Sequence, residues 1–267
     1  MVILITGVSS GFGKAMATRL AKDGHKVYGT VRRHVPPIEG VTYLFADVLD
    51  DKAIHHAFNE LMLKEKRIDV FINNAGMGIG GPLEFCSVAD IQHQMDVNFM
   101  GMVRWLSHII PTMRKQGFGQ IICISSIAGR MGLPFQGAYS ASKFAMTGYC
   151  EALRLELCQS GVRVILIEPG DFATSFSDNR CSVHSDVVAK AYPSYNQSME
   201  NVEQSESHGL KPSYLADKIS KIVRKTNPHN RYVIATWLQS ISVYAKRLLP
   251  EKVFFWILSK YFNLKGF

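Results

Sequence analysis

The segment "MVILITGVSSGFG" (residues 1–13) joins a short apolar run to a turn that is rich in glycine. We expect the run to form a first, buried strand, because it has neither the basic leader nor the small-residue cleavage site of a signal peptide. The turn carries Gly7, Gly11 and Gly13 and leads into the first helical pattern. Glycine lets a backbone approach a pyrophosphate, and the positive end of a helix attracts its charge. The segment therefore predicts a strand, turn and helix that bind a dinucleotide, with a plain tight turn as the alternative.

Short apolar runs alternate with helical patterns along most of the chain. Runs such as "QIICIS" and "RVILIE" are apolar on both faces, as buried parallel strands are. We therefore expect an α/β fold, a single Rossmann-type doubly wound domain with a seven-stranded, mostly parallel sheet and helices on both faces. The expected strands are residues 2–6, 26–31, 42–46, 70–73, 120–125, 163–168 and 232–235, and the expected helices are residues 13–23, 52–65, 87–115, 139–160 and 213–225.

Length and composition favour one domain with an appendage. The chain has 267 residues, of which 47% are hydrophobic, enough for one large core. We assign residues 1–235 to a Rossmann-fold catalytic domain, in which the polar, weakly periodic residues 171–211 form a mobile substrate loop or lid. Residues 236–267 form an aromatic and basic C-terminal extension. The chain has no apolar run of about 18 residues, so no transmembrane helix is expected.

Charge and cysteine content limit the classes of ligand. The net charge of +8 favours an anionic ligand or surface, but no basic stripe or nucleic-acid motif is visible, so we expect no nucleic-acid partner. Five scattered cysteines form no C-x-x-C pair, so neither disulfides nor a metal site is expected. A cytoplasmic location fits this cysteine usage.

The end of the second expected strand bears on the cofactor. The stretch "YGTVRRH" places Arg32 and Arg33 directly after Val31. A cofactor with a free ribose 2′-hydroxyl usually has an acidic residue there, whereas a guanidinium binds a 2′-phosphate. We therefore expect NADP(H) in preference to NAD(H). The alternative is that both arginines, and Arg33 in particular, are solvated loop residues.

Four motifs occur in order: "TGVSSGFG" (residues 6–13), "NNAG" (73–76), "YSASK" (139–143) and "PGDFAT" (169–174). With them, the chain resembles the short-chain dehydrogenases/reductases over about its first 175 residues. The stretches "NNAGMGIGGPLE", "MDVNFMGMVRWL" and "GLPFQGAYSASKFA" look closest to the branch of 17β-hydroxysteroid and retinol dehydrogenases. That branch uses NADP(H) and acts on hydrophobic alcohols and ketones.

The resemblance implies four catalytic residues. Tyr139 would be the general acid/base, and Lys143 would bind the nicotinamide ribose and lower the tyrosine pKa. Ser126, thirteen positions before the tyrosine, would orient the substrate oxygen. Asn98 would help to hold a water relay, although a buried asparagine often only satisfies backbone groups. The ordinary alternatives are an aromatic on a helix face for Tyr139, a solvated Lys143 and a turn residue at position 126.

The resemblance also implies the cofactor contacts. Asp47 would contact adenine, Thr174 would fix the carboxamide, and Arg32, helped by Ser10, would bind the 2′-phosphate. The full expected set is Gly7, Ser9, Ser10, Gly11, Phe12, Gly13, Arg32, Arg33, Asp47, Val48, Asn74, Ala75, Gly76, Tyr139, Lys143, Pro169, Gly170 and Thr174.

The chemistry of carbonyl reduction agrees with the catalytic assignment. Hydride transfer builds negative charge on the carbonyl oxygen, which needs a proton donor nearby. Lowering a tyrosine pKa from about 10 to near 7 requires roughly 4 kcal/mol. A partly buried ammonium and the charge of the oxidised nicotinamide could supply it. Tyr139 and Lys143 lie four residues apart, on one helix face, and strand alternation should turn Ser126 toward the site and Ser125 away from it.

The substrate side is rich in apolar residues. Residues 77–85, 131–135 and 171 onward should wall the pocket and bind a hydrophobic small molecule. The extension holds eight aromatic residues, five basic residues and one acidic residue. As a helix, "EKVFFWILSKYF" is apolar around most of its circumference, so it is either buried as a lid, core or dimer element or lies in a membrane interface.

These observations predict an NADPH-dependent carbonyl reductase or alcohol dehydrogenase that acts on a steroid, a retinoid or a long-chain 3-keto lipid. A reductase of 3-oxoacyl thioesters or small ketones is the enzymatic alternative, and it would need a polar, open pocket. A non-catalytic NADP(H)-binding regulatory protein is the alternative from another class. The resemblance further implies a homodimer or homotetramer through the two long helices, and peripheral membrane association through the extension stays open.

Overall fold

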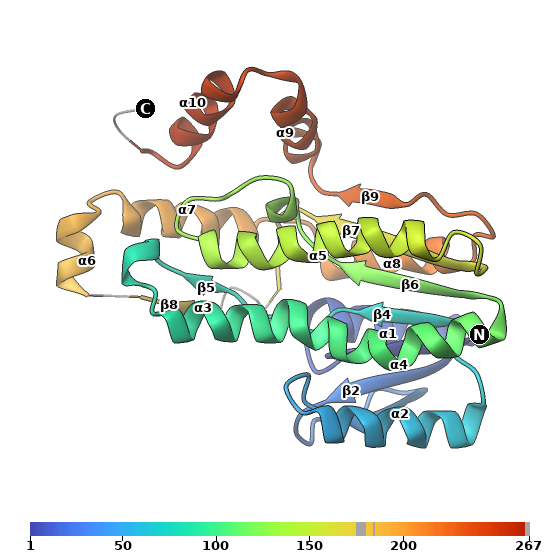
Figure 1. Ribbon diagram of the computed structural model, residues 1–267. Coiled ribbons are helices and arrows are strands. Elements are labelled where there is room, and N and C mark those ends of the chain that lie inside the picture. The colour runs from blue at the N-terminus through green and yellow to red at the C-terminus, as the bar shows by residue number, and fades with distance from the viewer. Residues whose placement is uncertain (175–179, 184, 265–267) are drawn as a thin grey trace.

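The computed structural model of the chain describes residues 1–174, 180–183 and 185–264 (Figure 1). Its centre is a sheet in the order β3-β2-β1-β4-β6-β7-β9, and every pairing in this sheet is parallel. The seven expected strands are thereby confirmed, to within about two residues at their ends. They are β1 (Val2–Ile5), β2 (Lys26–Val31), β3 (Val41–Phe45), β4 (Val70–Asn73), β6 (Gly119–Ile124), β7 (Val162–Pro169) and β9 (Arg231–Ile234).

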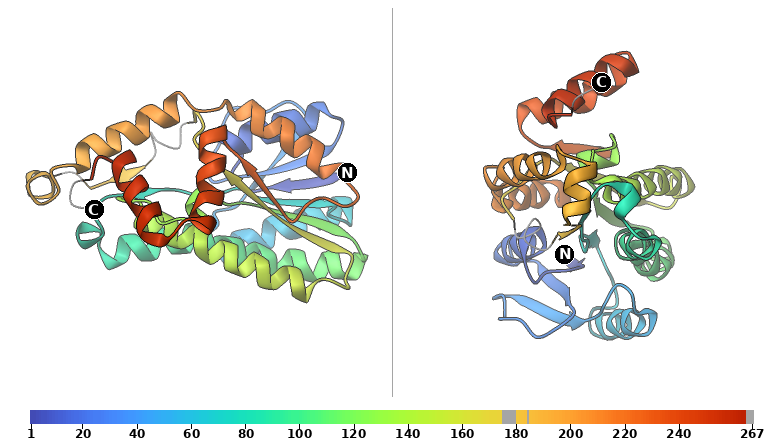
Figure 2. Two further views of the ribbon diagram at one scale, coloured as in Figure 1. Left: turned by 90° about the horizontal axis from the view of Figure 1, so that it is seen from above. Right: turned by 90° about the vertical axis from the view of Figure 1, so that its left-hand side faces the viewer.

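Helices cover both faces of the sheet, as expected (Figure 2). Strand alternation separates the two cores: Leu4 and Phe71 pack with one group of helices, whereas Ile3 and Ile72 pack with the other. The first group is α2 (Asp51–Glu65), α4 (Gly101–Gln116) and α5 (Gly137–Glu156), and the second is α1 (Gly11–Lys22) and α8 (Pro212–Val223). The chain runs outward from β1 to β3 and then returns to β4, so the strand order reverses between β1 and β4. In sheets of this kind, ligands bind at the carboxyl ends of the strands beside that reversal.

The helix expected over residues 87–115 is interrupted. It consists of α3 (Val88–Met95), a π-helical turn (Asp96–Met100) and α4. The Ser87 side chain and Asp90 form a capping box at the start of α3. A π-turn inserts an extra residue into a helix and commonly lies at functional sites. Here the turn contains Asn98, one of the expected catalytic residues.

The segment 171–211 contains more regular structure than expected. Beside α6 (Asp186–Ala191) and α7 (Tyr195–Ser207), β8 (Cys181–Ser182) pairs with β5 (Ile79–Gly80). Three residues of α7 at helical spacing, Tyr195, Met199 and Val202, are buried. This part is therefore largely helical where the sequence predicts a loop, because polar residues between those three hide the apolar stripe, and its role as a substrate loop or lid stays a prediction. Residues 175–179 and 184 of the expected loop lie outside the described residues.

The C-terminal extension folds into a helical hairpin, α9 (Trp237–Leu248) and α10 (Glu251–Tyr261), over one edge of the domain (Figure 2). The expected helix in "EKVFFWILSKYF" is therefore confirmed, and residues 265–267 lie outside the described part. Buried Val243 and Phe254 pack against Ile127 and Met131 of the catalytic domain. Among the described residues, no helix combines the length and apolar character needed to cross a membrane.

Candidate active site

A cavity of about 1080 Å³ opens at the carboxyl ends of the strands, beside the reversal of strand order. The glycine turn and the ends of β2 and β4 form one part of its wall, and Ser126, Tyr139 and Lys143 form the middle. Residues from α7, α9 and α10 form the remaining part. The structure thus brings the expected cofactor and catalytic residues into one cavity, except Gly13 and Asn98, which lie behind its wall.

The glycine turn is shaped for close approach. Gly7 and Gly11 have φ angles of +71° and +51°, which favour glycine. At Gly13 an added Cβ would lie 2.0 Å from the carbonyl oxygen of Gly7, so only glycine fits there. Asn74 Nδ2 donates hydrogen bonds to the carbonyl oxygens of Thr6 and Gly7, both at 2.9 Å, and ties the turn to β4. The turn therefore fits a pyrophosphate, with Gly13 acting through packing and Asn74 through the position of the backbone.

The far end of this wall is basic. Arg32 and Arg33 are exposed, follow β2 and line the cavity together with Ser10. Asp47 also lines it, and its Oδ1 accepts a hydrogen bond from the backbone N–H of Leu49 at 3.0 Å. Positions 32 and 33 hold guanidinium groups where a carboxylate would repel a phosphate.

The segment after β7 closes over the turn. The rings of Phe172 and Phe12 meet edge to face, with centroids 4.9 Å apart. Thr174 lies against Gly11, where an added Cβ would be 3.8 Å from the threonine Cβ. Pro169, Gly170 and Thr174 line the cavity, as expected for residues beside a bound cofactor.

Ser126, Tyr139 and Lys143 converge in the middle of the cavity wall. Tyr139 and Lys143 lie one turn apart on α5, and a hydrogen bond links the Tyr139 and Ser126 side chains. The adjacent Ser125 is buried, and within the described part of the chain its hydroxyl has no hydrogen-bond partner. Both serines line the cavity, contrary to the alternation expected from the sequence, and Ser126 is the one whose side chain is hydrogen-bonded to Tyr139.

Burial shifts the pKa values of Tyr139 and Lys143. Burial raises the pKa of Tyr139 to about 12, against the lowering effect of its hydrogen bond with Ser126. Lys143 Nζ donates to the carbonyl oxygen of Ile124 at 2.9 Å and lies 5.6 Å from the centroid of the Tyr139 ring. Burial lowers the pKa of Lys143 to about 8. The lowering of the tyrosine pKa by Lys143 and the oxidised nicotinamide stays a prediction, and in the protein by itself desolvation opposes the charged form of both side chains.

Asn98 is fully buried in the π-turn behind this wall. Its Oδ1 accepts from the backbone N–H of Met77 at 2.9 Å, and its Nδ2 donates to the Met77 carbonyl oxygen and to Ser142 Oγ, both at 3.0 Å. Ser142 Oγ in turn donates to the carbonyl oxygen of Tyr139 at 2.7 Å. Both amide hydrogens are therefore used for structure, which matches the alternative weighed from the sequence. A water relay at Asn98 stays a prediction.

A charged cluster near Tyr139 was missed by the sequence analysis. Asp171 and Glu206 line the cavity, and Arg180 forms an ion pair with Glu206 at 2.5 Å. Ser205 Oγ donates to Asp171 Oδ2 at 2.5 Å, and burial raises the pKa of Asp171. The charges of Glu206 and Asp171 raise the pKa of Tyr139 and that of Arg180 lowers it. The cluster was missed because Ser205 and Glu206 belong to α7, which the sequence did not predict.

The other side of the cavity is apolar. The expected walls contribute in part: Met77 from the first stretch, Met131 and Leu133 from the second, and Asp171, Phe172, Thr174, Cys181, Val202 and Glu206 from the third. Phe85 and Phe135 pack instead with tyrosines in a separate cluster beside α7. The C-terminal hairpin supplies most of the apolar wall, through Leu238, Ile241, Ala245, Leu249, Phe254, Ile257, Leu258, Tyr261 and Phe262.

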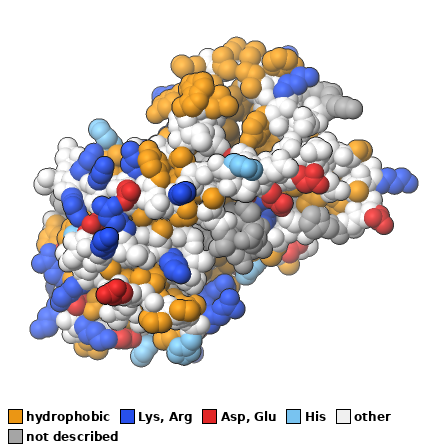
Figure 3. Space-filling model, turned by 180° about the vertical axis from the view of Figure 1, so that it is seen from behind, with side chains coloured by type: hydrophobic (Ala, Val, Ile, Leu, Met, Phe, Trp, Pro, Cys, Tyr) orange, Lys and Arg blue, Asp and Glu red, His pale blue; other side chains and the backbone are white. Residues whose placement is uncertain are grey.

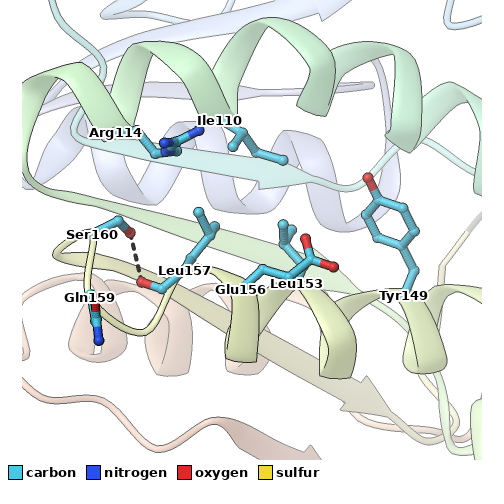
Figure 4. Close-up of a pocket in the computed structure, with 8 residues that line it drawn as sticks. All are labelled: Ile110, Arg114, Tyr149, Leu153, Glu156, Leu157, Gln159 and Ser160. Carbon is cyan, nitrogen blue, oxygen red and sulfur yellow. Dashed lines mark hydrogen bonds between the residues drawn. The ribbon is translucent and has the colours of Figure 1, made fainter.

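A second hollow, of about 580 Å³, lies between α4 and α5 (Figure 4). Ile110 and Arg114 line it from α4, and Tyr149, Leu153 and Glu156 line it from α5. None of the expected site residues contributes to it. Within the described part of the chain, no group of three or more His, Cys, Asp or Glu side chains is placed to hold a metal ion.

Comparison with known proteins places the chain among enzymes. A family model described as short chain dehydrogenase matches residues 1–182. The chain is 41% identical over 265 residues to a 3-ketodihydrosphingosine reductase of Bacteroides thetaiotaomicron, covering 99% of this chain and 98% of that protein. It is 39% identical over 193 residues to human 17-beta-hydroxysteroid dehydrogenase type 1, covering 66% of this chain and 58% of the human protein. A short-chain dehydrogenase structure from Streptomyces avermitilis matches with a TM-score of 0.77 at 26% identity, covering 94% of this chain and 97% of that one.

Proposed function

The chain belongs to the short-chain dehydrogenase family, and on that premise we propose that it is an NADPH-dependent reductase of a long-chain 3-keto lipid. The observation that carries the proposal is the shape of the cavity. One continuous cavity joins the Ser126, Tyr139 and Lys143 side chains to a long apolar wall on α9 and α10. The reacting ketone would lie at the tyrosine and the chain of the lipid along the helices.

The proposed chemistry uses each of the three side chains at a stated atom. NADPH, when bound, supplies the hydride. The Tyr139 hydroxyl donates its proton to the carbonyl oxygen, and Ser126 Oγ holds the same oxygen with a hydrogen bond. Lys143 Nζ is oriented by the Ile124 carbonyl oxygen and binds the ribose hydroxyls. Burial raises the pKa of Tyr139 to about 12, so the hydroxyl carries at neutral pH the proton that a general acid must donate.

The preference for NADP(H) rests on the residues at the end of β2. Arg32 and Arg33 line the cavity together with Ser10, and these residues would hold the 2′-phosphate of the cofactor. Guanidinium groups bind phosphate oxygens with paired, charge-assisted hydrogen bonds.

The charged cluster favours an amphiphilic substrate. Asp171 and Glu206 line the cavity near Tyr139, so the carbons next to the ketone would meet polar groups. The remainder of the substrate would meet the apolar hairpin. In steroids and retinoids, the groups next to the reacting carbon are mostly apolar. In a long-chain 3-keto lipid, a polar head group lies next to the ketone. The similarity to a 3-ketodihydrosphingosine reductase over nearly the whole chain supports the same choice.

A substrate panel tests the proposal. NADPH oxidation by the purified full chain would be measured with 3-ketodihydrosphingosine, a 17-ketosteroid, retinal and a short 3-oxoacyl thioester. We expect kcat/KM to be at least tenfold higher for 3-ketodihydrosphingosine than for the other three. A preference for the thioester would establish the alternative reductase. Binding of NADPH without turnover of any ketone would identify a regulatory protein.

A further inference from the structure

The two C-terminal helices expose apolar side chains on their outer faces. In α9, Trp237, Ile241, Tyr244 and Leu248 recur at intervals of four, three and four residues, so they form one stripe. Trp237 and Leu248 are 74% and 81% exposed. In α10, Val253, Trp256 and Ile257 are also exposed and share a face. Isolated exposed apolar residues are ordinary, but a contiguous patch of this kind marks an interaction surface.

Packing of the hairpin does not account for this patch. The opposite faces of the helices, with Val243 and Phe254, already pack against the catalytic domain. Trp237, Tyr244, Leu248, Val253 and Trp256 all lie outside the cavity wall. Within the described part of the chain, these five residues of the patch therefore belong neither to the core clusters nor to the cavity wall.

Basic residues accompany the patch (Figure 3). Arg247, Lys252 and Lys260 are exposed, and the Lys260 Nζ lies 5.8 Å from the centroid of the Trp256 ring. Glu251 is the acidic residue of the hairpin. Trp and Tyr beside Lys and Arg are the composition of helices that lie in the interface of an anionic bilayer. A surface for a second protein would not need this excess of positive charge.

The patch is continuous with the cavity. Leu238, Ile241, Ile257 and Tyr261 line the cavity and are also 60%, 50%, 47% and 52% exposed. These four residues form an apolar rim between the outer surface and the cavity, along which a long alkyl chain would meet apolar side chains.

We propose that the outer face of the α9–α10 hairpin docks on an anionic lipid bilayer and that a long-chain substrate enters the cavity from the bilayer along this rim. The docking rests on the surface alone, whereas the entry of substrate rests on the proposed function.

Vesicle binding tests the docking directly. The full chain would be sedimented with vesicles of phosphatidylglycerol and phosphatidylcholine (1:1) and with vesicles of phosphatidylcholine alone, at low and high salt. We expect binding to the mixed vesicles that weakens with salt. The triple variant Trp237→Ser, Leu248→Ser, Trp256→Ser should bind at least about tenfold more weakly, because its large apolar side chains no longer enter the bilayer. The matched control is Leu63→Ser, Val88→Ser, Leu155→Ser, which removes three apolar residues of at least comparable exposure from other helices and should bind as the wild type does.

Turnover separates the docking from the proposed function. With ketone carried in mixed vesicles, the hairpin variant should lose at least tenfold in rate, while its turnover of a short, water-soluble ketone should match the wild type. Ketone turnover by a wild type that does not bind vesicles would overturn the docking and leave the proposed function intact, and vesicle binding without ketone turnover would do the reverse. Two results with the triple variant would also overturn the docking and assign the patch to another role. One is unchanged vesicle binding. The other is that analytical ultracentrifugation shows the wild type as a dimer and the variant as a monomer, while vesicles bind neither.

Discussion

Replacement of Arg32 by alanine should change the choice of cofactor. Arg32 follows β2 and lines the cavity, and its proposed partner is the 2′-phosphate of NADPH. A hydrogen bond to a charged group contributes about 1.5–3 kcal/mol. Because Arg32 is exposed and screened by solvent, we take the lower end, which corresponds to about a tenfold change in affinity.

The assay is the ratio of the Kd of NADPH to the Kd of NADH, measured by fluorescence titration. Arg32→Ala should raise the Kd of NADPH about tenfold and leave that of NADH within about twofold. Arg163→Ala is the control, since Arg163 is exposed on β7, outside the cavity wall, and its loss changes the net charge equally. If Arg32→Ala weakened both cofactors by the same factor, the assignment of Arg32 to the phosphate would be refuted. A similar loss in Arg163→Ala would attribute the effect to general charge.

Three further predictions concern stability and the cofactor turn. Gly13→Ala should abolish measurable NADPH binding or lower the melting temperature, because its Cβ would lie 2.0 Å from the Gly7 carbonyl oxygen. The control Gly148→Ala should not destabilise the protein, because its Cβ would meet open space in a helix. Equal melting curves and equal NADPH binding for both variants would contradict the packing argument. The pKa of Lys143 is about 8 in the folded state, below its unfolded value, so the folded state loses this proton first as the pH rises. The free energy of unfolding, measured relative to Lys143→Met, should therefore rise between about pH 8 and 10.5, by up to roughly 3 kcal/mol. A difference in urea unfolding free energy that stays constant across this range would count against it. Glu206→Ala should lower the free energy of unfolding by about 3 kcal/mol, because it removes the ion-pair partner of the buried Arg180. Glu60→Ala, which breaks the exposed pair with Lys64, should lower it by less than about 1 kcal/mol. Similar losses for both variants in urea unfolding would show that solvent screens the Arg180 pair.

Features that depend on local pattern could be predicted from the sequence. The strands were found because each is a short apolar run between helical patterns. The glycine turn was found because its glycines are fixed in the sequence, and the structure shows why at Gly13, which has no room for a side chain. The shared helix face of Tyr139 and Lys143 followed from their spacing of four residues, whereas Ser126 came from the resemblance to the short-chain dehydrogenases/reductases.

Features that depend on packing between distant segments could not be predicted. α7 is amphipathic only through three buried residues among polar ones, and its Glu206 meets Arg180 26 positions away. The raised pKa of Tyr139 in the protein by itself could not be predicted, because the balance between burial and nearby charge requires the folded cavity. The sequence does not show which groups hydrogen-bond to the Asn98 side chain. The π-turn shows that it makes three hydrogen bonds, with the backbone of Met77 and with Ser142 Oγ.

The central claim is that Tyr139 is the proton donor in carbonyl reduction. Its most direct test is the single-turnover rate of ketone reduction by NADPH in Tyr139→Phe, with Tyr149→Phe as the control from the same helix, outside the active-site cavity. We predict that Tyr139→Phe reduces the rate by at least about a hundredfold, the contribution typical of general acid catalysis, with the Kd of NADPH unchanged. Tyr149→Phe should turn over at the wild-type rate. A Tyr139→Phe variant that reduces the ketone as fast as the wild type would contradict the account.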